Sequence, residues 1–116
     1  MKIHHLGINV ISLEQATAFY AQLGFYPEAE GPVELKSRGV KVLFLVNDQG
    51  TRLELVEKPI LEGTPYHLAY QVDGDLEPEL AALAHDQWGQ VPELGITNAF
   101  IFGPGGEKVE LVKVKK

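Results

Sequence analysis

The sequence predicts an α+β fold in which two tandem βαβββ modules form a cupped mixed sheet. Two internal matches predict it: residues 5–10 recur in order and chemistry at 67–72, and residues 50–56 recur at 106–112. Each match keeps the order of a His-bearing strand, a helix and a Glu-bearing strand. With 116 residues, 45% of them hydrophobic, the chain is long enough to bury the core of one domain.

The first module, about residues 1–58, begins with an alternating segment at 2–10 that predicts a strand. Ser12 and Gln15 have capping-box spacing, so we expect a helix from there to a stop at Gly24. One apolar stripe is expected on this helix, made of Leu13, Ala16, Phe19, Tyr20 and Leu23. Three further strands are expected near 25–33, 41–46 and 51–57.

The second module, about residues 63–116, repeats this order within the same single domain, 1–116. A Pro/Gly-containing connector near 59–65 separates the modules. The expected elements are a strand at 66–72, a helix at 75–88 and strands near 91–94, 97–102 and 107–114, the last entered by a turn at 103–106.

Composition and charge exclude several classes of function. The chain has no cysteine, which excludes a disulfide scaffold, a thiolate zinc site and a Cys nucleophile. The net charge of -6, with no basic cluster before the last four residues, argues against nucleic acid as a partner. The longest apolar run, residues 42–46, is too short for a membrane span, and the first residues lack a signal-peptide pattern. We therefore expect a soluble, cytoplasmic, small globular domain.

Strand parity places four polar residues on one face of the sheet. In the first strand of each module the bulky apolar residues pack under the helix, which leaves His5 and His67 on the opposite face. By the same argument Glu54 and Glu110 share that face. Two imidazoles and two carboxylates around open positions suit one divalent first-row ion, such as Ni, Co, Mn, Fe or Zn. Because both residue types are duplicated at matching positions, we interpret them as metal ligands.

Other polar residues are expected on the same face. Asn9 and Gln71 occupy equivalent positions four residues beyond each His, and they are candidates for hydrogen bonds to a substrate. Arg52 and Lys108 flank the two glutamates and are candidates to meet an anionic substrate. Core packing is the default expectation for the strand aromatics, which are Phe44, Phe100 and Phe102.

These motifs also resemble a known family. Residues 5–10, followed by Ser12-Leu13-Glu14-Gln15-Ala16 and by Phe19-Tyr20 with Leu23-Gly24-Phe25, resemble the opening of the vicinal oxygen chelate superfamily. Residues 102–111 resemble its closing strand. The superfamily includes glyoxalase I, extradiol dioxygenases and metal-free bleomycin-binding proteins. The resemblance implies that His5, Glu54, His67 and Glu110 are the four metal ligands, a set most similar to that of bacterial glyoxalase I.

The resemblance to glyoxalase I implies a metal-dependent lyase or isomerase. The ion would bind two vicinal substrate oxygens and stabilise an enediolate, with Glu110 as the catalytic base and Glu54 as its partner. Two positions differ from that enzyme: Asn9 stands where a glutathione-binding Arg is usual, and Lys58 stands where an Asn is usual. A different thiol adduct or another small oxygenated substrate is therefore as open as an adduct of glutathione.

Two other functions remain open within the superfamily. An Fe(II)-dependent extradiol-type dioxygenase would use His5, His67 and Glu110 as a facial triad. A drug- or metabolite-binding protein of the bleomycin-resistance kind would bind no metal. The superfamily commonly forms homodimers, which we expect here as well, and the site would form either within one chain or across two.

Overall fold

The computed structural model describes residues 2–58, 66–72, 89–102 and 108–114. The chain divides into two compact units, His5–Tyr66, called the N-terminal unit, and Met1–His4 with His67–Lys116, called the C-terminal unit. The expected helix at 75–88 and the expected turn at 103–106 lie outside the described residues. No helix within the described ranges has the length and apolar character needed to cross a membrane.

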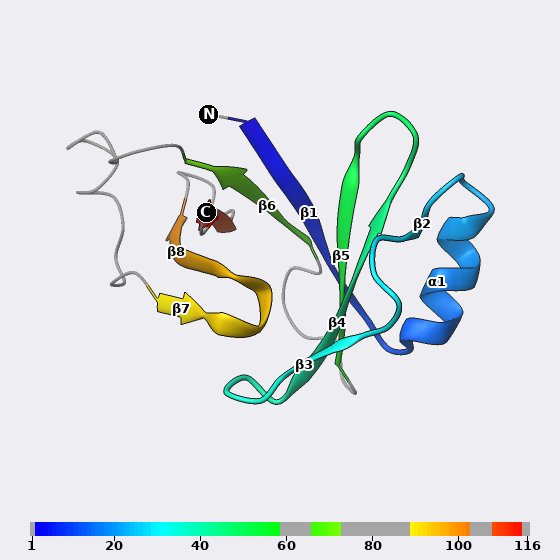
Figure 1. Ribbon diagram of the computed structural model, residues 1–116, viewed down its shortest axis with the longest axis horizontal. Coiled ribbons are helices and arrows are strands. Elements are labelled where there is room, and N and C mark those ends of the chain that lie inside the picture. Colours follow the sequence, from blue (N-terminus) through cyan, green and yellow to red (C-terminus); the bar gives the residue numbers. More distant parts are fainter. Residues whose placement is uncertain (1, 59–65, 73–88, 103–107, 115–116) are drawn as a thin grey trace. The chain divides into compact units, whose positions relative to one another are not determined.

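The N-terminal unit is a mixed sheet with one helix. Its elements are β1 (Lys2–Val10), which belongs to this unit from His5 onward, α1 (Leu13–Ala21), β2 (Tyr26–Pro27), β3 (Val33–Leu35), β4 (Val40–Val46) and β5 (Arg52–Glu57). The strand order is β2-β4-β5-β1, with β3 also paired to β4. Strand β1 runs parallel to β5, and β4 runs antiparallel to it (Figure 1). The central position of β5 brings Glu54 beside the His-bearing strand β1.

Helix α1 begins where Ser12 predicts and ends at Ala21, shortly before the expected stop at Gly24. The Ser12 Oγ accepts a hydrogen bond from the Gln15 backbone N–H at 3.2 Å, which satisfies one of the unpaired donors of the first turn. Gly24, at φ +92°, provides the left-handed residue after the helix. The Leu13 backbone N–H donates to the Glu57 Oε2 at 2.9 Å, so the start of the helix is also tied to the end of β5.

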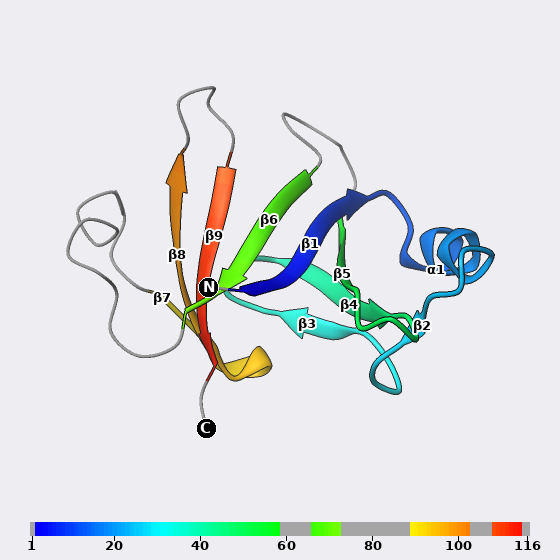
Figure 2. The same cartoon turned by 90° about the horizontal axis from the view of Figure 1, so that it is seen from above.

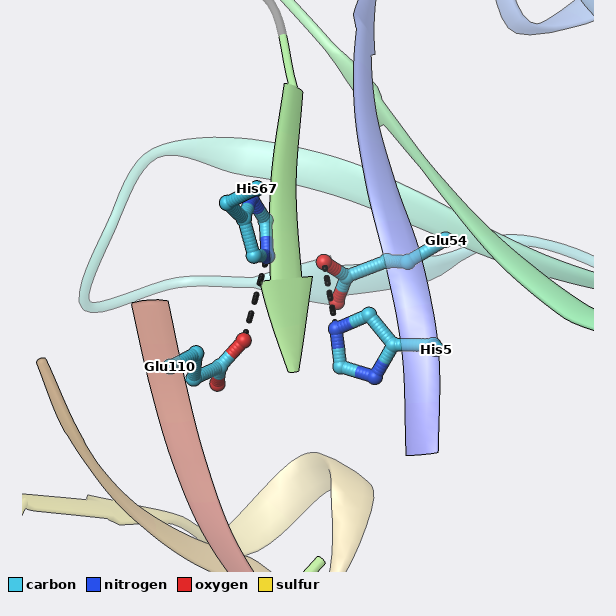
Figure 3. Close-up of side chains that lie close together, drawn as sticks. All are labelled: His5, Glu54, His67 and Glu110. Atoms are coloured by element: carbon cyan, nitrogen blue, oxygen red, sulfur yellow. Dashed lines mark hydrogen bonds and ion pairs between the residues drawn. The ribbon is translucent and has the colours of Figure 1, made fainter. Parts of the chain in front are cut away.

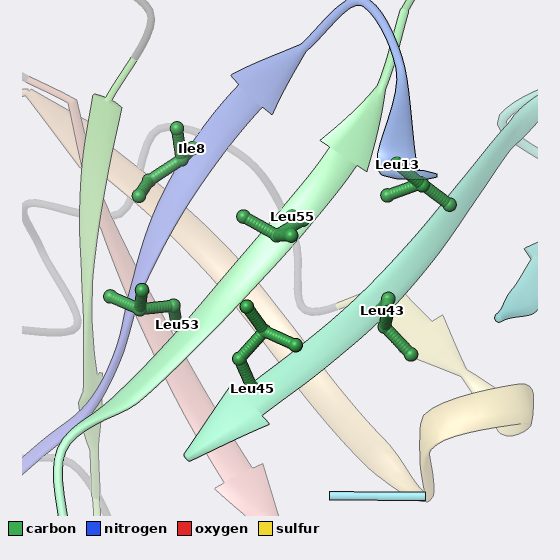
Figure 4. Packing of buried hydrophobic residues seen from close by; sticks show 6 residues of the cluster. All are labelled: Ile8, Leu13, Leu43, Leu45, Leu53 and Leu55. Carbon is green, nitrogen blue, oxygen red and sulfur yellow. The ribbon is translucent and has the colours of Figure 1, made fainter. Parts of the chain in front are cut away.

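The core of this unit lies between α1 and the sheet. Its buried members are Ile8, Leu13, Leu43, Leu45, Leu53 and Leu55, drawn in Figure 4. Ala16 and Tyr20 of α1 pack against this cluster, as the predicted stripe requires. Phe19 and Leu23 do not, because they are 57% and 61% exposed. The buried stripe is narrower than predicted, because Phe19 lies about 100° around the helix from Tyr20 and Leu23 lies beyond the last helical residue.

Truncation of a leucine at the centre of this core should be costly. Leu55 has no exposed surface, and Leu55→Ala is expected to lower the free energy of unfolding by about 2–5 kcal/mol. Exposed Phe19 provides the control, since Phe19→Ala should change it by no more than about 0.5 kcal/mol. Urea denaturation followed by circular dichroism measures both, and equal effects would contradict this description of the core.

The single strand expected at 25–33 is instead two short ones. Both β2 and β3 pair with β4, Tyr26 opposite Val46 and Val33 opposite Val42. Pro27 lacks a backbone N–H and cannot continue a hydrogen-bonded ladder, and the sequence Gly31-Pro32 interrupts it a second time. The expected strand was therefore too long.

The C-terminal unit also contains parallel and antiparallel strands. Its described elements are β6 (Tyr66–Gln71), β7 (Gly89–Val91), the 3₁₀-helix η1 (Pro92–Leu94), β8 (Ile96–Phe102) and β9 (Lys108–Val114). The strand order is β6-β9-β8-β7, and β6 runs parallel to β9 (Figure 2). The strand expected at 91–94 is wrong, because Pro92 starts a 3₁₀ turn that Gly95 ends at φ +65°.

Three strands of the C-terminal unit repeat three strands of the N-terminal unit position by position. Strands β7, β8 and β9 each begin 56 residues after β3, β4 and β5. The register repeats as well: Phe44 lies opposite Glu54, and Phe100 lies opposite Glu110. The predicted α+β class, with a mixed sheet and tandem strand order, is confirmed.

Candidate functional site

The first candidate pair lies in the N-terminal unit, on the face of the sheet away from α1. The His5 Nε2 and the Glu54 Oε1 are 3.6 Å apart (Figure 3). Both residues are buried, and His5 is only 1% exposed. Buried ionisable groups are retained where they are paired or where they bind a ligand.

The second pair repeats this arrangement in the C-terminal unit. The His67 Nε2 and the Glu110 Oε1 are hydrogen-bonded at 3.1 Å, which Figure 3 marks with a dashed line. Glu110 is buried and His67 is partly buried. Within each unit, a His from the first strand therefore meets a Glu from the last.

A small residue next to each pair explains how the carboxylate reaches the imidazole. Gly7 lies opposite Glu54 across β1 and β5, and Ala69 lies opposite Glu110 across β6 and β9. Each small residue follows its histidine by two positions and shares its face of the strand. With little or no side chain opposite, the carboxylate can turn along the sheet toward the histidine.

An aromatic ring accompanies each pair. The Phe44 and His5 rings meet edge to face with centroids 5.4 Å apart, and the Phe100 and His67 rings do so at 6.3 Å. Such contacts fix the plane of an imidazole. Sequence reasoning placed both phenylalanines in the core by default. The 56-residue offset already linking Glu54 to Glu110 would have identified them as an equivalent pair.

Asn98 is a further residue that sequence reasoning missed. It lies on β8 and is 3% exposed, and its Nδ2 donates to the Glu110 Oε2 at 3.0 Å. The signal available in the sequence was its position, two residues before Phe100 and therefore on the same face of the strand. Glu110 thus has a hydrogen-bond partner on each carboxylate oxygen.

The other predicted site residues lie along the same strands. Asn9 and Gln71 are partly buried at the fourth position after each histidine. The Arg52 Nε donates to the Glu28 Oε2 at 2.9 Å, which makes an ion pair at the start of β5. The equivalent Lys108 places its Nζ 4.2 Å from the centroid of the Phe100 ring. The two cations therefore have different neighbours.

Two tyrosines have raised pKa values, and neither belongs to a His–Glu pair. Burial raises the pKa of Tyr20 on α1, and the neighbouring Tyr66 raises it by a smaller amount. A hydrogen bond from its hydroxyl to Asp48, and then the charge of Asp48, raise the pKa of Tyr26 on β2, which is 48% exposed. Both tyrosines remain protonated near neutral pH.

All four residues of the two pairs are candidate metal ligands. Two atoms that each lie about 2.1 Å from one ion are about 3.0 Å apart at a right angle and about 3.4 Å apart at a tetrahedral angle. The separations within the pairs, 3.1 and 3.6 Å, are close to these values. Each pair fits two neighbouring positions around a divalent first-row ion.

Comparison with protein families identifies the larger group. Residues 4–96 match the model of the glyoxalase/bleomycin resistance protein/dioxygenase superfamily. The chain belongs to this superfamily. The match confirms the resemblance seen in the sequence, and it includes three of the four candidate ligands, His5, Glu54 and His67. No curated protein matches the chain significantly.

Several solved structures share the fold of this chain. A hypothetical protein from Bacillus halodurans C-125 has a TM-score of 0.67 at 20% identity, with 99% of this chain and 95% of that one covered. Glyoxalase I from Zea mays has a TM-score of 0.69 at 17% identity, with 99% of this chain covered but 43% of the maize chain. A superfamily member from Vibrio splendidus 12B01 has a TM-score of 0.64 at 13% identity, covering 97% and 99%. At these identities the likeness shows the fold alone.

Proposed function

We propose that this superfamily member is a divalent-metal-dependent lyase or isomerase, similar to glyoxalase I, that acts on a small substrate with vicinal oxygens. The observation that carries the proposal is the duplicated His–Glu pair, with separations of 3.6 and 3.1 Å on equivalent strands. We further propose that residues 1–116 form a single domain in which His5, Glu54, His67 and Glu110 hold one ion. Ni, Co, Zn, Mn and Fe all suit this ligand set.

In this proposal the protein moves a proton between adjacent substrate carbons. A bound divalent ion supplies Lewis-acid stabilisation of negative charge on the two vicinal oxygens. Glu110 removes the proton from one carbon and returns it to the next, because a buried carboxylate with a fixed orientation is suited to act as base and then as acid. Glu54 is its partner, and the two imidazoles stay in place against their phenylalanine rings.

We assign substrate contacts to three more residues on the same face. Asn9 and Gln71 have amides that can donate to and accept from substrate oxygens. Arg52 carries a guanidinium that can meet an anionic group, with its Nε donating to Glu28. Since Asn9 replaces the Arg usual in glyoxalase I, the thiol part of the substrate need not be glutathione.

Metal content and turnover together test this function. The purified, untagged protein is stripped with a chelator, reloaded separately with each of the five ions and analysed for bound metal. Hemithioacetals of methylglyoxal with glutathione and with other thiols are then assayed as substrates. About one ion per set of four ligands, with isomerisation restored by metal, is the expected result.

The other two superfamily functions give different outcomes in the same experiment. Oxygen uptake with catechols that requires Fe(II) would replace the isomerase proposal with the dioxygenase. A chain that binds no ion under any loading, and whose ligand affinity is unchanged by chelation, would replace it with a metal-free binding protein. Tight metal binding without turnover of any tested thiol adduct would reject this substrate class.

We also propose that the protein is a homodimer. Light scattering at micromolar concentration measures its mass. Mixing the separately inactive His5→Gln and His67→Gln variants shows which chains supply the ligands. Recovered activity would mean that each site takes one pair from each chain, whereas no recovery from a mixed dimer would mean that one chain supplies both pairs.

A further inference from the structure

The two glutamates differ in what lies beside them on the neighbouring strand. The Glu110 Oε2 accepts a hydrogen bond from the Asn98 Nδ2 at 3.0 Å, while its Oε1 bonds to the His67 Nε2 at 3.1 Å. The residue equivalent to Asn98, 56 positions earlier, is Val42 on β4. A valine side chain has no hydrogen-bonding group, so this position can offer nothing to Glu54.

The cross-strand partner of Asn98 differs in the same way. Gly89 lies opposite Asn98, whereas Val33 lies opposite Val42. A Cβ atom added at Gly89 would lie 3.4 Å from the Asn98 Oδ1. The N-terminal unit thus has two valines where the C-terminal unit has a buried amide with a glycine against it.

If packing were the only requirement, two apolar residues would be sufficient at the position of Asn98 and Gly89. Val33 and Val42 fill the equivalent position of the N-terminal unit in this way. Val42 is 1% exposed, so the two positions are equally buried. Burial of an amide costs free energy unless its polar atoms are hydrogen-bonded. The hydrogen bond to the Glu110 carboxylate compensates for this cost, and a bond to an ionised group is among the stronger ones.

We propose that Asn98 is a positioning residue that makes Glu110 the proton-transferring carboxylate of the two. The terminal torsion of a glutamate is broad and nearly two-fold, so one donor on Oε2 selects its orientation. With Oε2 held, Oε1 is presented on the side of His67, where the proposed ligand set and substrate lie. This inference rests on the proposed function. It adds that the hydrogen bond from Asn98 distinguishes Glu110 from Glu54.

Exchanges between the two equivalent positions test it. Asn98→Val gives the C-terminal unit the residue of the N-terminal unit, and Val42→Asn is the reciprocal variant. In the metal-loaded protein Asn98→Val is expected to lower kcat about 10- to 100-fold with KM little changed, and to weaken Co²⁺ affinity by a factor in the same range. Asn98→Gln, which keeps an amide donor, should recover part of the kcat.

Three results separate the possible failures. A wild-type chain that binds no divalent ion overturns the proposed function, and this inference with it. A folded Asn98→Val variant that matches the wild type in kcat and Co²⁺ affinity overturns the inference alone. If Asn98→Val does not fold, Asn98→Leu, which has nearly the size and branching of asparagine, replaces it, and unchanged kcat in that variant overturns the inference, since a leucine side chain has no donor for Glu110.

Discussion

Glu110→Gln is expected to reduce kcat by roughly 10²–10⁴-fold, the range typical for loss of a general acid–base group. The amide keeps the size of the carboxylate and keeps an oxygen that can accept from Asn98. It removes the negative charge and the capacity to take a proton. We therefore expect the free energy of unfolding to change by only about 1 kcal/mol. The loss of kcat corresponds to a larger change in the free energy of activation.

Matched variants control this measurement. Glu34→Gln changes an exposed carboxylate on β3 and should leave kcat and stability unchanged. Glu54→Gln changes the equivalent carboxylate of the N-terminal unit, and its loss of kcat should be smaller than that of Glu110→Gln. Steady-state kinetics with urea denaturation measures all three, and full activity in Glu110→Gln would reject Glu110 as the base.

Addition of a divalent ion should raise the melting temperature through the four proposed ligands. At a free metal concentration 100 times Kd, binding to the folded state alone adds about 2.7 kcal/mol of stability. For a chain of 116 residues this corresponds to a rise of about 10 °C. His5→Gln or His67→Gln should remove most of the rise, because each deletes one imidazole ligand.

The neighbouring His4 provides the control for the imidazole variants. It precedes His5 on β1 and points to the opposite face of the strand, so His4→Gln should keep the full metal-dependent rise. Differential scanning calorimetry with and without metal measures the four proteins. An equal rise in all of them would place the ion elsewhere.

Period-2 alternation and the internal repeat were sufficient to predict most of the sheet. Strands β1, β4, β5, β6, β8 and β9 lie within a residue or two of their expected bounds. Prolines account for two of the errors, since Pro27 shortened one expected strand and Pro92 turned another into η1. Both are local effects that alternation alone does not register.

The candidate site was predictable in part for a similar reason. Parity gives the face on which a side chain lies, which was enough to place each His with its Glu. Parity does not show which neighbours touch, so the rings of Phe44 and Phe100 and the amide of Asn98 were missed. Their roles follow from cross-strand register, which depends on how the strands pair in three dimensions.

The division of one expected strand into β2 and β3 has a further consequence. An uninterrupted edge strand would present a row of unpaired backbone groups on which another chain could add a strand. Here the outer edge of β4 is covered by pieces of two and three residues, and Pro27 offers no N–H. This edge of the N-terminal unit is therefore a poor template for cross-β aggregation, and Pro27→Val together with Pro32→Val would make it a better one.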